Sequence, residues 1–282
     1  MFQQDKVWSK YSNDKVDIAH TLARVIRTLF KALPLDREMT ALSVGSSNEP
    51  QFRILESAFR GGLYLLDIED AALDVVAERV KRQGTDRVVL LAGDFTKTLA
   101  DRASARRFRE TRLDGRRMTL VTLHHSLYYA PRSAWPAIFE GLLGEILVAP
   151  ARRAVSSAIH AVLMANRSDD PSTTTWLYNH FAGRFCGAHN DQDLAGFARE
   201  LRSPGMRVLR KSTRVDFRVD DFERLMGVVW MILLYPNVHH YTREQRVEII
   251  EHVYERFWLP SVPLAQVQDH VVLYRGRGPA LL

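Results

Sequence analysis

Short apolar runs alternate with helical segments through the first 163 residues, and this alternation constrains the fold more than any other feature. The runs have the length and composition of buried strands and lie at residues 40–45, 62–67, 86–93, 118–125 and 153–163. Helical periodicity marks residues 71–83 and 133–147 between them. Strands that are apolar without alternation are buried on both faces, as in a parallel sheet covered by helices. We therefore predict a doubly wound α/β domain.

The remaining segments extend this pattern at both ends. An amphipathic helix is predicted at residues 14–33, and further helices at 173–185, 191–202, 220–234 and 242–257. Strands are predicted at 206–212 and 269–276. With no repeat and no linker, residues 1–282 form one predicted domain. Its parts are an N-terminal helical cap at 1–35, a half at 36–163, and a half at 164–276 that contains a helical insert at 213–260.

Composition excludes several classes of protein. A chain of 282 residues that is 46% hydrophobic can bury a large core and is not a disordered protein. Cys186 is the only cysteine, so no internal disulfide can form, and we expect it to be a buried thiol. The longest apolar run, 225–235, is well short of the roughly 20 residues that span a bilayer, so it is either core or a homodimer interface. The N-terminal residues lack the apolar stretch of a secretion signal. We expect a cytoplasmic protein that binds no membrane.

A basic segment raises the question of nucleic acid. The net charge is +6, and arginines are concentrated at 102–117. On a helix they would surround the whole circumference, and only Phe108 is interleaved for stacking on bases. We therefore interpret the segment as a solvated, arginine-rich connection.

Polar residues follow the predicted strands at the edge where an open parallel sheet binds its ligands. Gly45 follows the first strand, Asp67 ends the second, and Asp94 and Phe95 follow the third. Asp67 can accept hydrogen bonds from both hydroxyls of a ribose, or cap the helix after it. Asp94 and Phe95 can contact an adenine, or form a capped turn. Together these strand ends predict a nucleoside site.

The order of elements over residues 36–276 resembles the class I S-adenosylmethionine-dependent methyltransferases. That family has seven strands, the last antiparallel, in a Rossmann-like sheet. The run ALSVGSSNEPQFRILES, the LYY after the fourth strand, the AGRF at 182–185 and the helical insert look like the histamine N-methyltransferase family. The resemblance implies S-adenosylmethionine as cofactor and a small-molecule methyl acceptor, an amine or hydroxyl of a metabolite or natural product.

The resemblance also assigns roles to individual residues. Its cofactor positions are matched by Gly45, Ser46, Ser47, Asp67, Asp94, Phe95, Thr96 and His124. Its substrate positions are matched by His125, Tyr128, Tyr129, Tyr178 and Gln268, with His125 and Tyr129 as the catalytic candidates. His125 would be a base or a substrate anchor, because an imidazole titrates near pH 6.5. The acid that binds an amine substrate would be Asp14 or Asp17.

The first loop departs from the family pattern. The family has glycines at alternate positions, whereas this chain has Gly45, Ser47 and Glu49. A methionine moiety carries no pyrophosphate, so the need for bare backbone is weaker than in dinucleotide enzymes. Weak cofactor affinity, or a fold relative without catalysis, stays open.

Other interpretations remain for the same residues. Neighbouring residues of a strand point to opposite faces, so His124 and His125 are not expected to chelate one metal ion. The tyrosines could simply pack in the core. An enzyme of this fold that uses S-adenosylmethionine for other chemistry, or acts on nucleic acid or protein, is also open. The chain has HHSLYY where nucleic-acid enzymes of the fold carry Asn-Pro-Pro-aromatic, which weighs against a nucleic-acid substrate.

Overall fold

The computed structural model describes residues 14–32, 38–45, 51–150, 155–201, 205–234 and 239–276. The predicted cofactor residues Ser46 and Ser47 lie outside the described residues, and so does Glu49.

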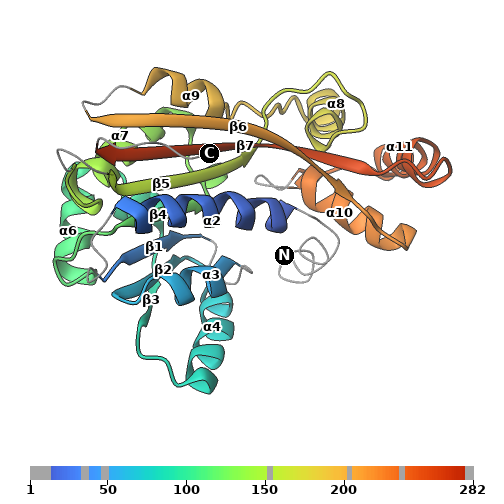
Figure 1. Ribbon diagram of the computed structural model, residues 1–282. Helices are drawn as coiled ribbons and strands as arrows, with labels where there is room; N and C mark the ends of the chain where they lie inside the picture. Colours follow the sequence, from blue (N-terminus) through green and yellow to red (C-terminus); the bar gives the residue numbers. More distant parts are fainter. Residues whose placement is uncertain are drawn as a thin grey trace. The chain divides into compact units, whose positions relative to one another are not determined.

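A seven-stranded sheet organises the described part of the chain (Figure 1). Its strand order is β3-β2-β1-β4-β5-β7-β6. The strands are β1 (Thr40–Val44), β2 (Gly62–Asp67), β3 (Val88–Ala92), β4 (Leu120–His124), β5 (Val155–Met164), β6 (Met206–Phe217) and β7 (Leu264–Gly276). The five strands from β1 to β5 are joined by parallel pairing.

The last strand runs against its neighbour β5. The N–H of Ala165, just after β5, donates to the carbonyl of Val267 near the start of β7. Ser156, at the start of β5, instead donates from its hydroxyl to the carbonyl of Arg275 near the end of β7. These contacts order the two strands in opposite directions. The predicted α/β sheet, mostly parallel, is therefore confirmed.

Helices connect and flank these strands. They are α2 (Asp14–Ala32), α3 (Gln51–Ala58), α4 (Asp70–Gln83), α5 (Phe95–Thr98), α6 (Arg102–Arg112), α7 (Trp135–Gly141), α8 (Thr174–Cys186), α9 (Leu194–Glu200), α10 (Phe222–Leu234) and α11 (Arg243–Val253). A π-helical turn, η3 (Leu142–Ile146), continues α7. No helix among the described residues is both long and apolar enough to cross a bilayer.

The chain forms two compact units. The sheet unit comprises residues 18–163, 195–211 and 270 onward, and the helical unit comprises residues up to 17, 164–194 and 212–269. In the sheet unit, Leu22 and Val25 of α2 share a core with Ala41, Leu63 and other strand residues. In the helical unit, α8, α10 and α11 pack around a second core that includes Phe181, Val228 and Ile249.

Three local expectations are corrected. Cys186 is exposed, because it lies at the last position of α8. Residues 102–112 are helix α6 rather than a connection, capped where the Asp101 carboxylate accepts the Ser104 N–H, although several of the arginines are solvent-exposed as expected. Strand β6 continues to Phe217 rather than 212, because it lies at the sheet edge and its exposed residues give no apolar signal.

Candidate active site at the carboxyl edge of the sheet

The predicted cofactor residues lie together at one edge of the sheet unit. β3, β2, β1 and β4 are consecutive in the sheet, and Asp94, Asp67, Gly45 and His124 stand at or just beyond their carboxyl ends. The loops there are tied to the neighbouring strands. The Gly45 N–H donates to the carbonyl of Leu66 at 2.8 Å, and the N–H of Gly93 donates to the carbonyl of Asp67 at 2.8 Å.

Asp67 is half-buried and is not the N-cap residue of α4. One carboxylate oxygen accepts the N–H of Glu69 at 3.1 Å. Glu69 itself holds the N-cap position, and its side chain makes no capping hydrogen bond. The helix-cap alternative for Asp67 is therefore wrong, and its carboxylate stands on the ligand-binding edge.

Asp94 forms a capped turn, which was one of the two interpretations of this residue from the sequence. Its Oδ1 accepts the N–H of Thr96 at 2.9 Å and the Thr96 hydroxyl at 2.6 Å, and Lys97 lies 3.5 Å from Oδ2. Burial raises the pKa of Asp94, but the Thr96 hydrogen bonds and the Lys97 charge outweigh it, so that the net pKa is lowered. Phe95 is buried. The turn presents an ionised carboxylate, and an adenine contact by these residues stays a prediction.

The chain turns sharply after β4. His125 has φ of 54°, in the left-handed region that non-glycine residues rarely adopt. Its N–H donates to the carbonyl of Val162, and its ring stacks on Tyr128 with centroids 6.0 Å apart. His124 is buried, and its Nε2 lies 3.0 Å from Nδ1 of His160. Tyr129 is 49% exposed, so it belongs to the surface rather than the core.

Gly45 and Ser126 meet where the β1 and β4 loops approach each other. Gly45 has φ of 67°, and a Cβ built on it would lie 2.8 Å from Cβ of Ser126. The Ser126 hydroxyl is buried and has no hydrogen-bond partner among the described residues. Ser126 was not among the site residues predicted from the sequence. Its position two residues after the end of β4 is the one feature of the sequence that could have pointed to it.

Gly45→Ala should destabilise the protein more than the same change at Gly84. Both glycines have positive φ, but a Cβ at Gly84 meets nothing within 4 Å. The left-handed backbone alone costs an alanine about 1–2 kcal/mol, and Gly45→Ala adds the clash with Ser126. Urea unfolding of both variants measures the difference. The double variant Gly45→Ala, Ser126→Gly should recover the clash part; equal losses at Gly45 and Gly84 would contradict the close approach.

The remaining predicted substrate residues belong to the helical unit. Tyr178 is buried, and its hydroxyl lies 3.1 Å from Nε2 of His239. Burial raises the pKa of Tyr178, with smaller contributions from Cys186 and Asp191. Gln268 is fully buried and donates to the carboxylate of Asp17 at 2.7 Å. The structure thus joins the predicted amide to one of the two candidate acids; the Asp14 side chain lies outside the described part.

The helical unit also contains a polar hollow that sequence reasoning missed. It has a volume of about 450 Å³ and is lined by Asn166 and Arg167 after β5, and by His189, Asn190 and Asp191 after α8. Its lining is polar throughout, whereas most small-molecule sites are lined mainly by apolar side chains. Within the described residues, no group of three histidine, cysteine or acidic side chains is placed to hold a metal ion.

Comparison with known proteins relates the chain to others by fold. No protein-family model and no curated protein matches its sequence. Among solved structures, the YcgJ protein of Bacillus subtilis has a TM-score of 0.55 at 12% identity, over 92% of this chain and 99% of that one. A protein of Galdieria sulphuraria, provisionally assigned as a sarcosine dimethylglycine methyltransferase, has a TM-score of 0.50 at 14% identity, over 94% of this chain and 86% of that one.

A third structure carries a ligand pair. The phosphoethanolamine N-methyltransferase 2 of Haemonchus contortus, in complex with phosphomonomethylethanolamine and S-adenosylhomocysteine, has a TM-score of 0.50 at 10% identity, over 89% of this chain and 52% of that one. These similarities give no specific support to histamine N-methyltransferase. At such identities they show one thing, that the chain has the Rossmann-like fold found in S-adenosylmethionine-dependent methyltransferases.

Proposed function

We propose that this protein is an S-adenosylmethionine-dependent methyltransferase that methylates a small molecule. The observation that carries the proposal is the set of strand ends in the sheet unit: a glycine, an acid and a second acid follow three adjacent parallel strands. That is where an open α/β sheet binds a nucleoside. The methyltransferase fold of the solved structures supports the same cofactor.

The residues of the edge fit such a cofactor. Gly45 leaves the loop without a side chain where a Cβ would collide, and the buried Ser126 hydroxyl beside it has no hydrogen-bond partner among the described residues. Asp67 would accept the two ribose hydroxyls, and Asp94 the adenine amino group. When bound, the cofactor supplies a methyl group on a sulfonium sulfur.

The protein's part in catalysis is alignment. Methyl transfer is an in-line displacement, so a catalyst gains most by holding the nucleophile close to the methyl carbon and on its axis. His125 and Tyr128, stacked on each other, offer an imidazole and an aromatic face that can hold a cationic acceptor. Tyr129, exposed beside them, is the second catalytic candidate. The acceptor proposed is an amine or hydroxyl of a soluble metabolite.

Asp67→Ala should weaken binding of S-adenosylhomocysteine at least tenfold. A hydrogen bond to a charged group contributes about 1.5–3 kcal/mol, and Asp67 would make two to the ribose. Isothermal titration calorimetry on the full chain measures the change. Asp86→Ala is the matched control, because it removes the same charge from an exposed position at the opposite, amino end of β3.

The calorimetry also separates the alternatives. Binding that is equal in the wild-type protein and the Asp67 variant would refute the assignment of Asp67. Absence of binding to the wild-type protein would favour a fold relative without cofactor. If S-adenosylhomocysteine binds as expected, a methyl-acceptor screen beginning with imidazole and aromatic amines distinguishes methyl transfer from other chemistry on the same cofactor.

A further inference from the structure

Three buried histidines form a continuous chain in the sheet unit. His124 of β4, His160 of β5 and His270 of β7 are 3%, 0% and 1% exposed. Nε2 of His124 lies 3.0 Å from Nδ1 of His160, and Nε2 of His160 lies 3.3 Å from Nδ1 of His270. The same strands carry other buried polar residues, such as Thr122, Ser157 and Gln268. Burying polar groups costs free energy unless they are hydrogen-bonded, so three imidazoles are expected here only if they pair with one another or with neighbours.

The sheet register explains how distant residues meet. Ser43 is paired with Thr122, and Thr122 with His160, so these side chains lie on one face of the sheet. The Thr122 hydroxyl donates to the Ser43 hydroxyl at 3.1 Å. Ala41 and Ala158, two residues before Ser43 and His160, contact the core formed with α2. The histidines thus continue a buried polar row toward the carboxyl edge, where His124 ends β4.

The order of the ring nitrogens gives the row of three histidines a direction. Each contact joins Nε2 of one ring to Nδ1 of the next, so a proton must lie between the two nitrogens for a hydrogen bond to form. If His124 carries its proton on Nε2, His160 receives it at Nδ1 and must donate from its own Nε2 to His270. With all three rings neutral, the reverse sense, with protons on Nδ1 of His270 and of His160, is the other arrangement that keeps both hydrogen bonds. Neither ring can change tautomer alone without breaking a buried hydrogen bond.

We propose that His124, His160 and His270 form a proton-sharing chain that serves the candidate active site. In it, His124 accepts the proton lost by the methyl acceptor. His160 and His270 are positioning residues that fix the tautomer of His124. This rests on the proposed function, and it gives His125 the role of substrate anchor rather than base.

The three histidines account for every proton in the proposed transfer. As the nucleophile bonds to the methyl carbon and the carbon–sulfur bond breaks, the acceptor N–H or O–H bond breaks and its proton passes to Nδ1 of His124. The Nε2 proton of His124 passes to Nδ1 of His160, and the Nε2 proton of His160 passes to Nδ1 of His270. The positive charge then resides on His270, away from the sulfur that has just become neutral. Hydrogen-bonded chains in a low-dielectric interior polarise one another, which favours such sharing.

Nitrogen NMR of the histidine-labelled full chain tests the proposal without any cofactor. We expect His124 and His160 to carry their protons in the same sense, both on Nε2. His270→Leu removes the acceptor at the end of the chain and should change the tautomer of both His160 and His124. His270→Asn, whose side-chain oxygen can take the place of Nδ1, should restore the wild-type pattern at both rings. The exposed His20→Gln variant is the control and should change neither.

Three results would overturn the proposal. The first is a wild-type spectrum with His124 and His160 protonated in opposite senses. The second is a wild-type spectrum with both protons on Nδ1, because Nδ1 of His124 could then not accept the proton of the methyl acceptor. The third is a His270→Leu spectrum in which His160 changes and His124 does not. If circular dichroism shows that His270→Leu does not fold, two other results still test the proposal. They are the nitrogens on which wild-type His124 and His160 carry their protons, and the spectrum of His270→Asn. Where a methyl acceptor has been found, His270→Leu should lower kcat about 10- to 100-fold with KM unchanged. Failure of cofactor binding would refute the proposed function and leave the tautomer result readable.

Discussion

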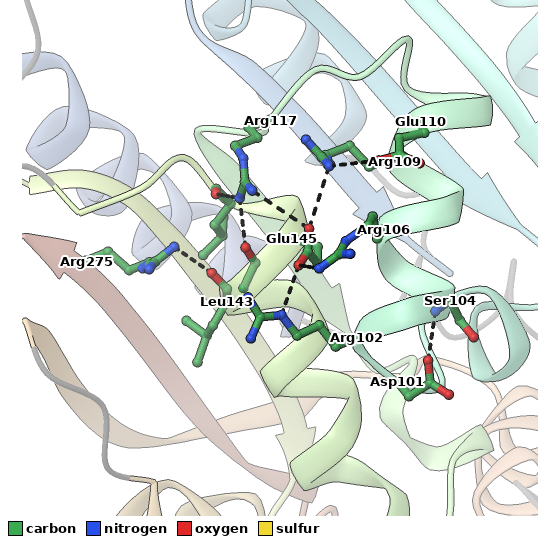
Figure 2. Close-up of polar contacts among 12 residues, drawn as sticks. Asp101, Arg102, Ser104, Arg106, Arg109, Glu110, Arg117, Leu143, Glu145 and Arg275 are labelled. Carbon is green, nitrogen blue, oxygen red and sulfur yellow. Dashed lines mark hydrogen bonds and ion pairs between the residues drawn. The ribbon is translucent and has the colours of Figure 1, made fainter.

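Glu145→Gln should lower the unfolding temperature by several degrees at neutral pH and reduce the loss of stability in acid. Glu145 lies in η3, its side chain is 4% exposed, and four arginines approach its carboxylate (Figure 2). Arg102 and Arg106 bond to Oε1 at 2.9 and 3.1 Å, and Arg109 and Arg117 lie 3.6 and 3.8 Å from Oε2. A neutral amide would leave these guanidinium groups close together without their shared counter-charge.

The loss of stability in Glu145→Gln should depend mainly on the two arginines that are least exposed to water. Arg102 and Arg106 are 57% and 54% exposed, so water can solvate them when the carboxylate is removed. Arg109 and Arg117 are 17% and 33% exposed and have less access to water. Arg117 also donates to the carbonyls of Gly144 and Leu147 and so holds the end of η3. Loss of Glu145 should therefore disturb the packing of α6 on η3 as well as the charge balance.

The pH dependence follows from the pKa of Glu145. Hydrogen bonds from Arg106 and Arg102 lower that pKa from 4.5 to about 2. A lowered pKa means that the carboxylate stabilises the folded state fully above about pH 4.5, and that this contribution is lost as the pH falls toward 2. The difference in stability between wild type and Glu145→Gln should be constant near neutral pH and shrink across that window. Thermal unfolding followed by circular dichroism at several pH values measures it.

Glu110→Gln is the control for this experiment. Glu110 contacts Arg109 at 3.3 Å but is 58% exposed, and an exposed ion pair contributes little to stability. We expect it to unfold within about a degree of wild type, on the scale of surface substitutions. If Glu145→Gln behaved like Glu110→Gln at every pH, the arginine cluster would have no structural role.

This cluster also shows where sequence reasoning failed. Arg102, Arg106 and Arg109 all meet the Glu145 carboxylate and so lie on one face of α6. A charged face is usually the solvent-exposed side of an amphipathic helix, whereas the packed side is apolar. Their partner Glu145 lies far along the chain, in a π-helical turn whose position no local pattern predicts. A surplus of arginines therefore looked like a solvated connection until the three-dimensional structure supplied the carboxylate.

The part of the candidate site that lies at the ends of strands could be predicted from the sequence. The positions of Gly45, Asp67 and Asp94 after apolar runs were enough to place them on the carboxyl edge. His160 and His270 were not predictable in this way, because they lie inside strands and meet only through the order β4-β5-β7. The hollow after β5 and α8 depends on two loops that come together in the folded helical unit.

Asp17→Ala should destabilise the protein by about 3 kcal/mol, near a 100-fold change in the folding equilibrium. The Asp17 carboxylate accepts hydrogen bonds from the buried Gln268 amide and from the Thr213 hydroxyl. Each is a hydrogen bond to a charged acceptor, worth about 1.5–3 kcal/mol. Urea unfolding measures the loss. Asp216→Ala removes the same charge three residues from Thr213, from a side chain that is 37% exposed, and should cost far less.

Asp17→Asn separates the structural from the substrate-binding role of this acid. An asparagine keeps an oxygen that can accept from Gln268, so most of the stability should remain. If Asp17 also binds a cationic amine, loss of its charge should raise KM for that amine with little change in kcat, because binding to substrate and transition state falls equally. If Asp17→Asn leaves KM unchanged while Asp17→Ala is unstable, Asp17 has only a structural role, which is to hold α2, β6 and β7 together. The residue that recognises the acceptor must then be sought elsewhere, first at Asp191 in the polar hollow.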